Sequence, residues 1–388
     1  MKKKIAILGS TGSIGSETIN LIKKDKKNFD VILLSTNTNI YKIYKQAKFF
    51  NVKNIIINDS NSFKKAKKLY KNSSIKFHNS FSIIDKLFKK KEIFYSMISV
   101  VGLDGLDPSL RLIKYTQNIA IINKESLICG WNLINQQLQK YKTNFFPIDS
   151  EHFSIFSLLN GANINDVDKV YITASGGPFL NYNYNKLSKI TVNQALKHPN
   201  WIMGKKISID SSTMMNKLFE VIEAKKIFDL SYDKIKILIH PKSYVHAIVE
   251  FKNGLSKILI HEPEMKIPIH NSIYFKNDKK LKSKKINFKI LNQLNFQSVN
   301  YKKFPLVKLL NILPNHHSLF ETVLVTINDY FVSAYLKKKI NYKQLIKLIK
   351  KYSHLIKFTK FKKNTPKSIN DIYKTRKYVN EILSNSGI

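Results

Sequence analysis

The sequence of 388 residues is long enough for two or three domains, and its hydrophobic fraction of 43% argues against a mainly disordered chain. The 66 Lys and Arg residues exceed the 26 Asp and Glu residues by 40, a charge that raises the alternative of a nucleic-acid-binding protein. The basic residues are nevertheless spread along the whole chain. We therefore expect no specific nucleic-acid binding, although a small anionic substrate would be attracted.

The cellular location is predicted from the single cysteine and the N-terminal residues. Cys129 cannot form an intrachain disulfide, which is typical of a reducing compartment. The apolar run after MKKK is too short for a secretory signal, and no stretch reaches the length of a membrane span. The sequence therefore predicts a cytoplasmic protein that does not enter a membrane.

A glycine-rich turn follows the first apolar run. Residues 4–8 predict a buried parallel strand, and Gly9, Gly12 and Gly15 follow before a helix that begins near residue 16. Glycines let the backbone approach a pyrophosphate, and the helix N-terminus supplies free N–H groups. The spacing GxxGxxG therefore indicates a dinucleotide site, with an ordinary strand-to-helix turn as the alternative.

The next strand, at 30–34, ends in the neutral residues STNTN. A site that prefers NAD usually has an acidic residue here, which binds the ribose hydroxyls. Neutral hydroxyl and amide groups would not repel a 2′-phosphate, so the sequence favours NADP(H). No basic residue lies in the turn itself, and Lys42 or Lys45 would have to assist.

Strand-like runs at 54–57, 95–101 and 119–122 alternate with helix-like segments. This alternation predicts a parallel sheet with helices on both faces, and ligands bind beyond the carboxyl ends of such strands. Lys124 follows the last of these runs and is placed to contact both cofactor and substrate. Without this position it would be one more surface lysine.

Two carboxylates, Asp149 and Glu151, lie where a strand gives way to a helix. They would repel each other unless a cation lies between them, and Mg²⁺ or Mn²⁺ prefers such oxygen ligands. The alternative is that these acids stabilise a helix N-terminus. After a further strand at 171–174, Ser175 and two glycines predict a phosphate-binding loop or a tight turn.

The stretch 198–223 has the richest pattern. A loop with His198, Trp201 and Met203 is expected first, then a short strand at 205–210 and a helix announced by two serines, Ser211 being the first. Polar side chains one turn apart fall on one face of that helix and can converge on one ligand, unless this face is simply solvated. They are Thr213, Asn216, Lys217 and Glu220.

The remainder of the chain predicts strands at 236–239 and 245–251 and an exposed, Lys- and Asn-rich stretch at 277–302. Helical patterns then predict a small C-terminal bundle without obvious chemistry. They lie at 306–313, 317–337, 342–356 and 368–383.

These segments carry, in order, the motifs LGSTGSIG, NKES, PIDSEH, SGGPF, HPNWxMG, the run 208–220, IHPxS and EPEMxIPI. With them the chain closely resembles the deoxyxylulose phosphate reductoisomerases, the NADPH- and divalent-metal-dependent enzymes of the non-mevalonate isoprenoid route. The resemblance extends from Gly9 to about Phe275 and is less clear over the helical tail.

The resemblance implies an α/β fold with an N-terminal Rossmann-like parallel sheet, a central α+β catalytic domain and a C-terminal α-helical bundle, assembled as a homodimer. The NADPH-binding domain would span 1–149. The catalytic, metal-binding and dimerisation domain would span 150–276, with a flap near 198–204. A linker at 277–302 and the bundle at 303–388 would complete the chain.

The resemblance also implies roles for individual residues. The metal ion, Mg²⁺ or Mn²⁺ with Co²⁺ as a further candidate, would be held by Asp149, Glu151 and Glu220. The substrate phosphate would be held by Ser175, Ser211, Asn216 and Lys217. Other substrate contacts would come from Lys124, Ser150, Glu151, His198 and Glu220, and the flap from Trp201 and Met203. The catalytic set would be Lys124, Asp149, Glu151, Glu220 and His198. NADPH would contact Thr11, Gly12, Ser13, Ile14, Asn37, Thr38, Asn39, Asn123, Glu125 and Gly204.

The implied reaction has two stages. The metal-held keto sugar phosphate breaks and remakes a carbon–carbon bond to give a branched aldehyde, and NADPH then delivers hydride, which yields methylerythritol phosphate. A simpler NADP-dependent dehydrogenase is the rival enzyme, but it has no use for three metal-binding carboxylates.

Four positions depart from the family pattern. Thr38 stands where many relatives have a lysine near the 2′-phosphate. Leu218 and His261 stand in place of glycines, and Glu264 in place of an aspartate. None of these departures removes a predicted ligand.

Overall fold

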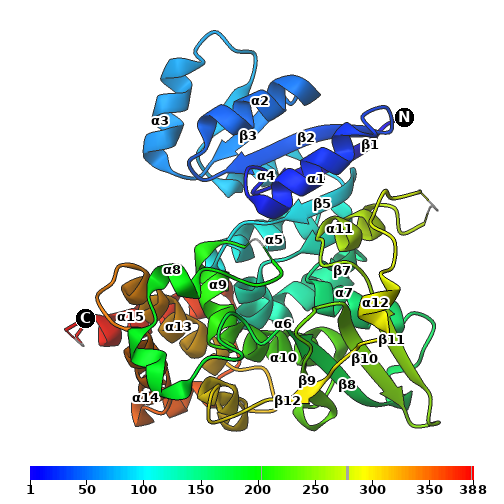
Figure 1. The fold of residues 1–388 in the computed structure, drawn as a ribbon. Coiled ribbons are helices and arrows are strands. Elements are labelled where there is room, and N and C mark those ends of the chain that lie inside the picture. The colour runs from blue at the N-terminus through cyan, green and yellow to red at the C-terminus, as the bar shows by residue number, and fades with distance from the viewer. Residues whose placement is uncertain (202, 277–278, 386) are drawn as a thin grey trace. The chain divides into compact units, whose positions relative to one another are not determined.

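The computed structural model describes residues 1–201, 203–276, 279–385 and 387–388 (Figure 1). The chain forms two compact units, which are described separately. The first contains Met1–Leu127, Asn132–Asp149 and Met265–Lys282, and the second contains Ile128–Trp131, Ser150–Glu264 and Ser283–Ile388. The predicted flap at 198–204 and linker at 277–302 include residues 202, 277 and 278, which lie outside the described residues.

The first unit is built on a seven-stranded sheet with the order β4-β3-β2-β1-β5-β6-β7, in which every pair is parallel. This is the predicted Rossmann-like sheet. The predicted strands at 4–8, 30–34, 54–57, 95–101 and 119–122 are confirmed; the bounds of 54–57 are as predicted, and the other strands have shifted ends. The strands are β1 Lys3–Leu8, β2 Phe29–Thr36, β3 Asn54–Ile57, β4 Lys76–His78, β5 Ile93–Ile98, β6 Thr116–Ile121 and β7 Asn144–Pro147.

Continuous apolar runs form these strands because both faces of the sheet are covered. Ile5, Ile7, Leu34 and Ile55, for example, are fully buried. The helices of this unit are α1 Ser13–Lys23, α2 Ile40–Phe50, α3 Ser60–Leu69, α4 Ile84–Leu87, α5 Leu106–Ile113, α6 Lys124–Tyr141 and α11 Lys266–Ile273, with the 3₁₀ helices η1 Phe81–Ile83 and η2 Leu103–Gly105; residues 128–131 of α6 belong to the second unit.

The second unit contains a mixed five-stranded sheet with the order β11-β10-β8-β9-β12. Only β8 and β9 pair in parallel, and the neighbouring pairs are antiparallel. Ile155 of α7 and Val221 of α10 pack on apolar residues of this sheet, including Ile172 and Val249. The strands are β8 Val167–Ala174, β9 Ile235–Ile239, β10 Val245–Phe251, β11 Ser256–Ile260 and β12 Gln297–Ser298, and the two helices are α7 Ser150–Leu158 and α10 Met215–Phe228.

The C-terminal part of the second unit is helical, as predicted, and α13 contacts both α14 and α15 (Figure 1). The predicted helix at 306–313 is a 3₁₀ helix. The remaining helices of the second unit are α8 Val192–Ala195, α9 Lys205–Ser212, α12 Phe288–Leu291, α13 Phe320–Leu336, α14 Tyr342–Ser353 and α15 Ile369–Ser384, with η3 Ile164–Asp166, η4 Tyr184–Lys189, η5 Tyr232–Lys234, η6 Pro305–Ile312 and η7 Ile356–Lys362. Among the described residues, no helix is both long and apolar enough to cross a membrane.

The predicted strand at 205–210 is wrong, because this segment is helix α9. Its alternating apolar residues suggested a strand, but the buried Asp210 forms an ion pair with Lys206 one helical turn earlier and accepts a hydrogen bond from Asn328 of α13. The Lys206–Asp210 pair favours the helix, because residues four apart lie on the same helix face. The next helix, α10, begins at Met215 after Met214 in a left-handed conformation, so Ser211 closes one helix and does not cap the next.

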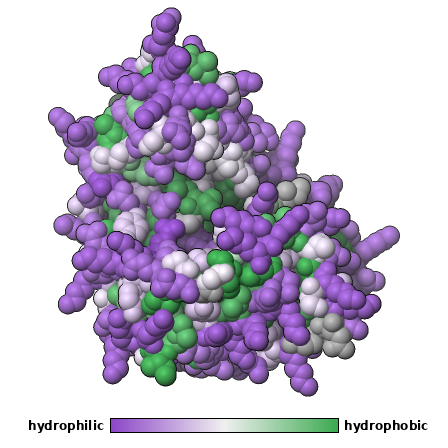
Figure 2. All heavy atoms as spheres, turned by 90° about the vertical axis from the view of Figure 1, so that its left-hand side faces the viewer, coloured by the Kyte–Doolittle hydropathy of each residue, from purple (hydrophilic) through white to green (hydrophobic). Residues whose placement is uncertain are grey.

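The surface carries many of the lysines. On the face drawn in Figure 2, hydrophilic residues cover most of the area and hydrophobic residues form smaller groups among them. The hydrophilic residues spread over this whole face and do not form a single stripe.

The segment Met265–Lys282 belongs to the first unit, although the predicted catalytic domain extends to residue 276. Tyr274 explains part of this placement. Its hydroxyl donates to Asp25 at 2.8 Å, and Asp25 is 3% exposed and also pairs with Lys279. Burial alone would raise the pKa of Asp25, but the contacts from Lys279 and Tyr274 hold it below its ordinary value.

We expect Tyr274→Phe to lower the Tm of the protein by roughly 2–8 °C. Loss of a hydrogen bond to a buried carboxylate costs about 1–2 kcal/mol, and each kcal/mol shifts the Tm by about 2–4 °C in a domain of this size. Differential scanning fluorimetry measures the change. Tyr41→Phe removes an exposed hydroxyl and is the matched control. Equal melting of the two variants would contradict the prediction.

Candidate active site

The glycine turn between β1 and α1 has two glycines that the fold requires and one that it does not. A Cβ on Gly9, which has φ 79°, would lie 2.5 Å from the Ser99 carbonyl oxygen, and one on Gly15 would lie 2.2 Å from the Gly9 oxygen. A Cβ on Gly12 would meet only the Gly9 oxygen, at 3.4 Å. Gly12 is exposed and caps α1 without a side-chain hydrogen bond, so the helix N-terminus is left for a phosphate.

The predicted cofactor residues of the first unit lie around this turn and at the ends of two other strands. Ser13 and Ile14 open α1, and Asn37, Thr38 and Asn39 are exposed after β2. Thr11 and Thr36 share a hydroxyl hydrogen bond of 2.7 Å, which joins the turn to the end of β2.

Asn123 and Glu125 are both nearly buried where β6 meets α6. The Asn123 side chain caps α6 by accepting from the Ser126 N–H at 2.6 Å, and it donates to the carbonyls of Val100 and Gly102. Its side chain therefore has a structural role, and a cofactor contact from Asn123 would use its backbone. Gly204, the remaining predicted cofactor residue, is exposed and caps α9 in the second unit.

Three predicted metal ligands converge. One carboxylate oxygen from each of Asp149, Glu151 and Glu220 lies within 4.8 Å of the other two. Asp149 immediately precedes α7, Glu151 lies in its first turn, and Glu220 comes from α10 and is 1% exposed. The oxygen donors and their spacing fit one hard divalent cation.

Lysine ammonium groups balance the charge of these carboxylates. The Lys217 Nζ donates to Glu151 at 2.7 Å and to Glu220, and Lys124 pairs with Asp149. Burial alone would raise the pKa of Glu151, but Lys217 brings it well below its usual range, helped by His246 and by a hydrogen bond from Ser150. Burial would likewise lower the pKa of Lys217, yet the two carboxylates raise it. Glu151 and Lys217 are therefore both charged at neutral pH.

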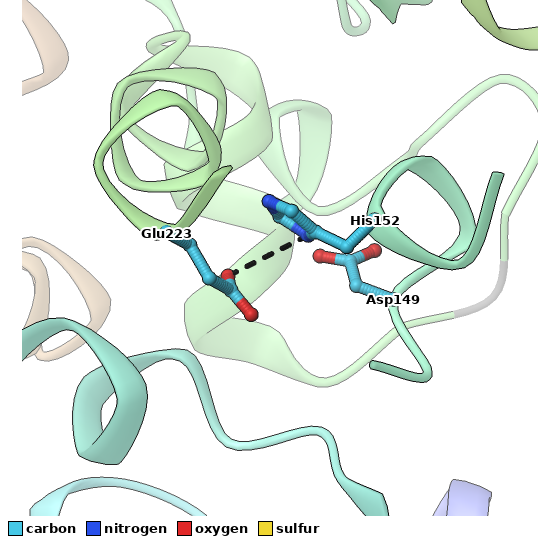
Figure 3. Close-up of side chains that lie close together, drawn as sticks. All are labelled: Asp149, His152 and Glu223. Carbon is cyan, nitrogen blue, oxygen red and sulfur yellow. Dashed lines mark ion pairs between the residues drawn. The ribbon is translucent and has the colours of Figure 1, made fainter. Parts of the chain in front are cut away.

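A second cluster lies beside the first and was not predicted. Figure 3 shows His152 of α7 and Glu223 of α10 near Asp149. The His152 Nε2 lies 2.9 Å from the backbone oxygen of Glu220, and Nδ1 lies 3.8 Å from the Glu223 carboxylate. His152 thereby links the helices that carry two of the predicted ligands. A signal was present, because His152 and Glu223 each lie one helical turn after a predicted ligand.

The predicted phosphate-binding residues do not all face one point. Lys217 contacts the carboxylates, and the Asn216 amide donates to Glu220. Ser175 accepts from the Gly177 N–H, and a Cβ on Gly177 would lie 2.8 Å from the Ser211 oxygen, so the glycine loop lies against the end of α9. Thr213, expected on the same face, instead donates to the carbonyls of Ile209 and Asp210.

His198 holds the predicted flap to the loop after β8. Its Nδ1 accepts from the backbone N–H groups of Asn200 and Trp201, at 3.2 and 3.0 Å. Nε2 must therefore carry the proton, and it donates to Ser175 Oγ at 3.0 Å. Burial, with Lys217 as a further cause, lowers the pKa of His198 to about 4, so the ring is a neutral donor at physiological pH.

Two further histidines were missed as site residues. Trp201 packs edge-on against His246, which stacks on His261 with ring centroids 3.7 Å apart. His246 Nε2 donates to the His261 carbonyl at 3.0 Å, and burial lowers the pKa of His246 to about 3. The sequence singled out His261 only as a departure from the family. In the structure its ring stacks on His246, which packs against the flap residue Trp201. Met203, the other flap residue, is half-buried.

Three family profiles match successive parts of the chain. Residues 5–130 match 1-deoxy-D-xylulose 5-phosphate reductoisomerase, 145–228 match its C-terminal domain, and 260–382 match the DXP reductoisomerase C-terminal domain.

Curated relatives cover the whole chain. The 1-deoxy-D-xylulose 5-phosphate reductoisomerase of Pelagibacter ubique is 54% identical over 387 residues, which cover 100% of both chains. The enzyme of the same name from Clostridium tetani is 37% identical and covers 89% of this chain and 91% of its own length.

Solved structures agree with the sequence matches. The reductoisomerase from Zymomonas mobilis in complex with NADPH superposes with a TM-score of 0.86 at 29% identity, covering 98% of this chain and 97% of its own. A DOX-P reductoisomerase in complex with NADPH, fosmidomycin and magnesium gives 0.91 at 27% identity, covering 99% and 98%. With profiles, full-length relatives and fold in agreement, the chain belongs to the 1-deoxy-D-xylulose 5-phosphate reductoisomerase family.

Proposed function

We propose that Asp149, Glu151 and Glu220 form the centre of the activity that family membership gives this chain. As a reductoisomerase, it converts 1-deoxy-D-xylulose 5-phosphate to 2-C-methyl-D-erythritol 4-phosphate with NADPH and a divalent metal ion. The observation that carries the assignment is the convergence of three carboxylate oxygens within 4.8 Å of one another. The rival, a simple dehydrogenase, would have no need for this arrangement.

The three carboxylates would hold Mg²⁺ or Mn²⁺, and Co²⁺ has the same ligand preferences to a lesser degree. When bound, the cation supplies Lewis-acid polarisation of the substrate carbonyl and orients a neighbouring hydroxyl. Lys124 pairs with Asp149, and Ser150 donates to Glu151 at 2.6 Å, so a substrate held at the metal ion would lie next to both residues.

The substrate phosphate would be bound by a lysine, an amide and two hydroxyls. Lys217 stays charged at neutral pH, and its ammonium can pass from the carboxylates to a phosphate once a metal ion balances their charge. The Ser175 hydroxyl accepts from Gly177 and His198 and keeps its own hydrogen for the phosphate. Asn216 and Ser211 complete the set.

The loop with Trp201 and Met203 would cover the bound substrate. His198 fixes this loop to Ser175, and the Asn200 amide donates to the Pro241 carbonyl and the Ser243 hydroxyl, each at 2.7 Å. A cover of this kind excludes water from the rearrangement and from the aldehyde that follows it.

NADPH would lie along the first unit, with its pyrophosphate at Gly12, Ser13 and Ile14. When bound, the cofactor supplies the hydride that reduces the branched aldehyde. Asn37, Thr38 and Asn39 would line the site of the adenosine ribose. Thr11 would lie between the ribose and the pyrophosphate. Asn123, Glu125 and Gly204 would provide the remaining cofactor contacts.

A homodimer and a cytoplasmic location are further parts of this proposal. The family resemblance supports the dimer, and the single buried cysteine, Cys129, supports a reducing compartment.

Purified protein should oxidise NADPH only when deoxyxylulose phosphate and a divalent cation are both present. Absorbance at the NADPH band, with and without Mg²⁺ or Mn²⁺, measures this directly. Treatment with EDTA should stop turnover, because the three carboxylates would then hold no cation. Turnover that persists at full rate in EDTA would reject the metal assignment.

The variants Asp149→Asn and Glu220→Gln should each lower kcat by at least roughly 10³-fold, because Lewis-acid stabilisation contributes several kcal/mol and each 1.36 kcal/mol is a factor of ten. NADPH binding, measured by fluorescence titration, should change little. Asp168→Asn, at an exposed acid of β8, is the control for charge. If either site variant kept metal-independent turnover, the ligand set would be wrong.

His198→Asn should lower kcat/KM about 10- to 100-fold, since losing the hydrogen bonds that fix the flap costs about 1–3 kcal/mol. The shape of its pH profile from pH 6 to 9 should match that of the wild type. The reason is that a ring with a pKa of about 4 binds no proton in this range. Loss of an acidic limb near pH 6.5 in the variant alone would show that His198 titrates during turnover.

A further inference from the structure

Helix α2 is fixed to the glycine turn by a buried glutamine. Gln46 is 6% exposed, its side-chain oxygen accepts from the Ser10 hydroxyl at 2.7 Å, and its amide donates to the Ser10 carbonyl at 2.9 Å. Both hydrogen bonds are buried, so they hold one face of α2 against the turn.

Lys42 lies one helical turn before Gln46 and therefore shares this face. Its Nζ donates to the Thr11 carbonyl at 3.0 Å and to the Ser16 hydroxyl at 2.6 Å. Both acceptors are neutral, and in the described part of the chain no carboxylate pairs with Lys42. The Lys42 side chain is exposed, so its ammonium is accessible to an anion at the turn.

Lys42 contacts Thr11 in the turn and Ser16 in the first turn of α1, and Thr11 connects this place to the end of β2. Thr11 bonds through its hydroxyl to Thr36, the last residue of β2, and the exposed Asn37 and Thr38 follow. In a nucleotide site of this topology the adenosine ribose lies at the end of β2, and a basic residue there binds a 2′-phosphate. The pyrophosphate lies instead at the N-terminus of α1.

We propose that Lys42 binds the 2′-phosphate of NADPH and gives this chain its preference for NADPH over NADH. The proposal rests on the proposed function, because it assumes the cofactor site at the glycine turn. It assigns to Lys42 the charge that Thr38 cannot supply. Ser16 and the Thr11 carbonyl hold the ammonium in place, so little side-chain freedom is lost when the phosphate binds.

Lys45 is the other lysine that the sequence offered for this role, and it serves as a matched control. It lies on the same helix, three residues later, and is exposed. No hydrogen bond or ion pair joins Lys45 to the turn, whereas two hydrogen bonds join Lys42 to it. A general electrostatic attraction would depend on both lysines, but a specific phosphate contact depends on Lys42 alone.

Isothermal titration calorimetry of the full-length protein tests the proposal without turnover. We expect Lys42→Met, which keeps an unbranched side chain and removes the charge, to weaken NADPH binding by about tenfold, the loss expected for one charge-assisted contact. NADH binding should stay within twofold. Adenosine 2′,5′-bisphosphate should lose affinity in the same way, and adenosine 5′-monophosphate should not. Lys45→Met should behave as the wild type with every ligand.

The outcomes separate the alternatives. Equal losses for NADPH and NADH would place Lys42 at the pyrophosphate and overturn the proposal. No loss for NADPH, or the same loss in Lys45→Met, would also overturn it. Each of these results leaves the proposed function standing. Failure of the wild type to bind NADPH at all would instead reject the proposed function itself. An unchanged Tm in both variants verifies that they are folded.

Discussion

Buried negative charge is the constraint on which the second unit is organised. Glu220 is 1% exposed and Glu151 lies close to it, so the two would repel strongly in a dry environment. Lys217, three residues before Glu220 on the same helix, donates to both carboxylates. Two buried carboxylates this close together favour a cation between them, and the same arrangement makes the site suitable for a divalent metal ion.

The surrounding elements hold these charged side chains in fixed positions relative to one another. His152 bonds to the backbone of α10 from α7, so that the helices carrying Glu151 and Glu220 cannot shift independently. On the other side, His198 joins the flap to the loop after β8, and His261 supports His246 behind Trp201. Three histidines thus act through neutral hydrogen bonds and ring contacts, because burial lowers the pKa of His198, His246 and His261 and keeps them uncharged.

Much of the fold could be predicted because its signals are local. A short apolar run bounded by glycine predicted β1, strand-like runs alternating with helix-like segments predicted β3, and helical periodicity predicted α13 to α15 within a few residues. The segment 205–210 was predicted wrongly, since alternation of apolar residues suggests a strand when the partners of Asp210 are unknown. One of those partners, Asn328, lies on α13 more than a hundred residues away, and local patterning carries no information about it.

The sequence by itself determined which chemical groups are available: three acids, their neighbouring lysines and a glycine turn. It also indicated the family whose motifs contain these groups. It named Lys42 and Lys45 as equals for a 2′-phosphate and did not single out His152, Glu223 or His246. Only the tertiary structure decided among such candidates. Whether a side chain reaches a site depends on how helices and strands pack, and packing is a property of residues that are distant in the chain. Gln46 on Ser10 shows this, since that contact turns Lys42 toward the cofactor turn.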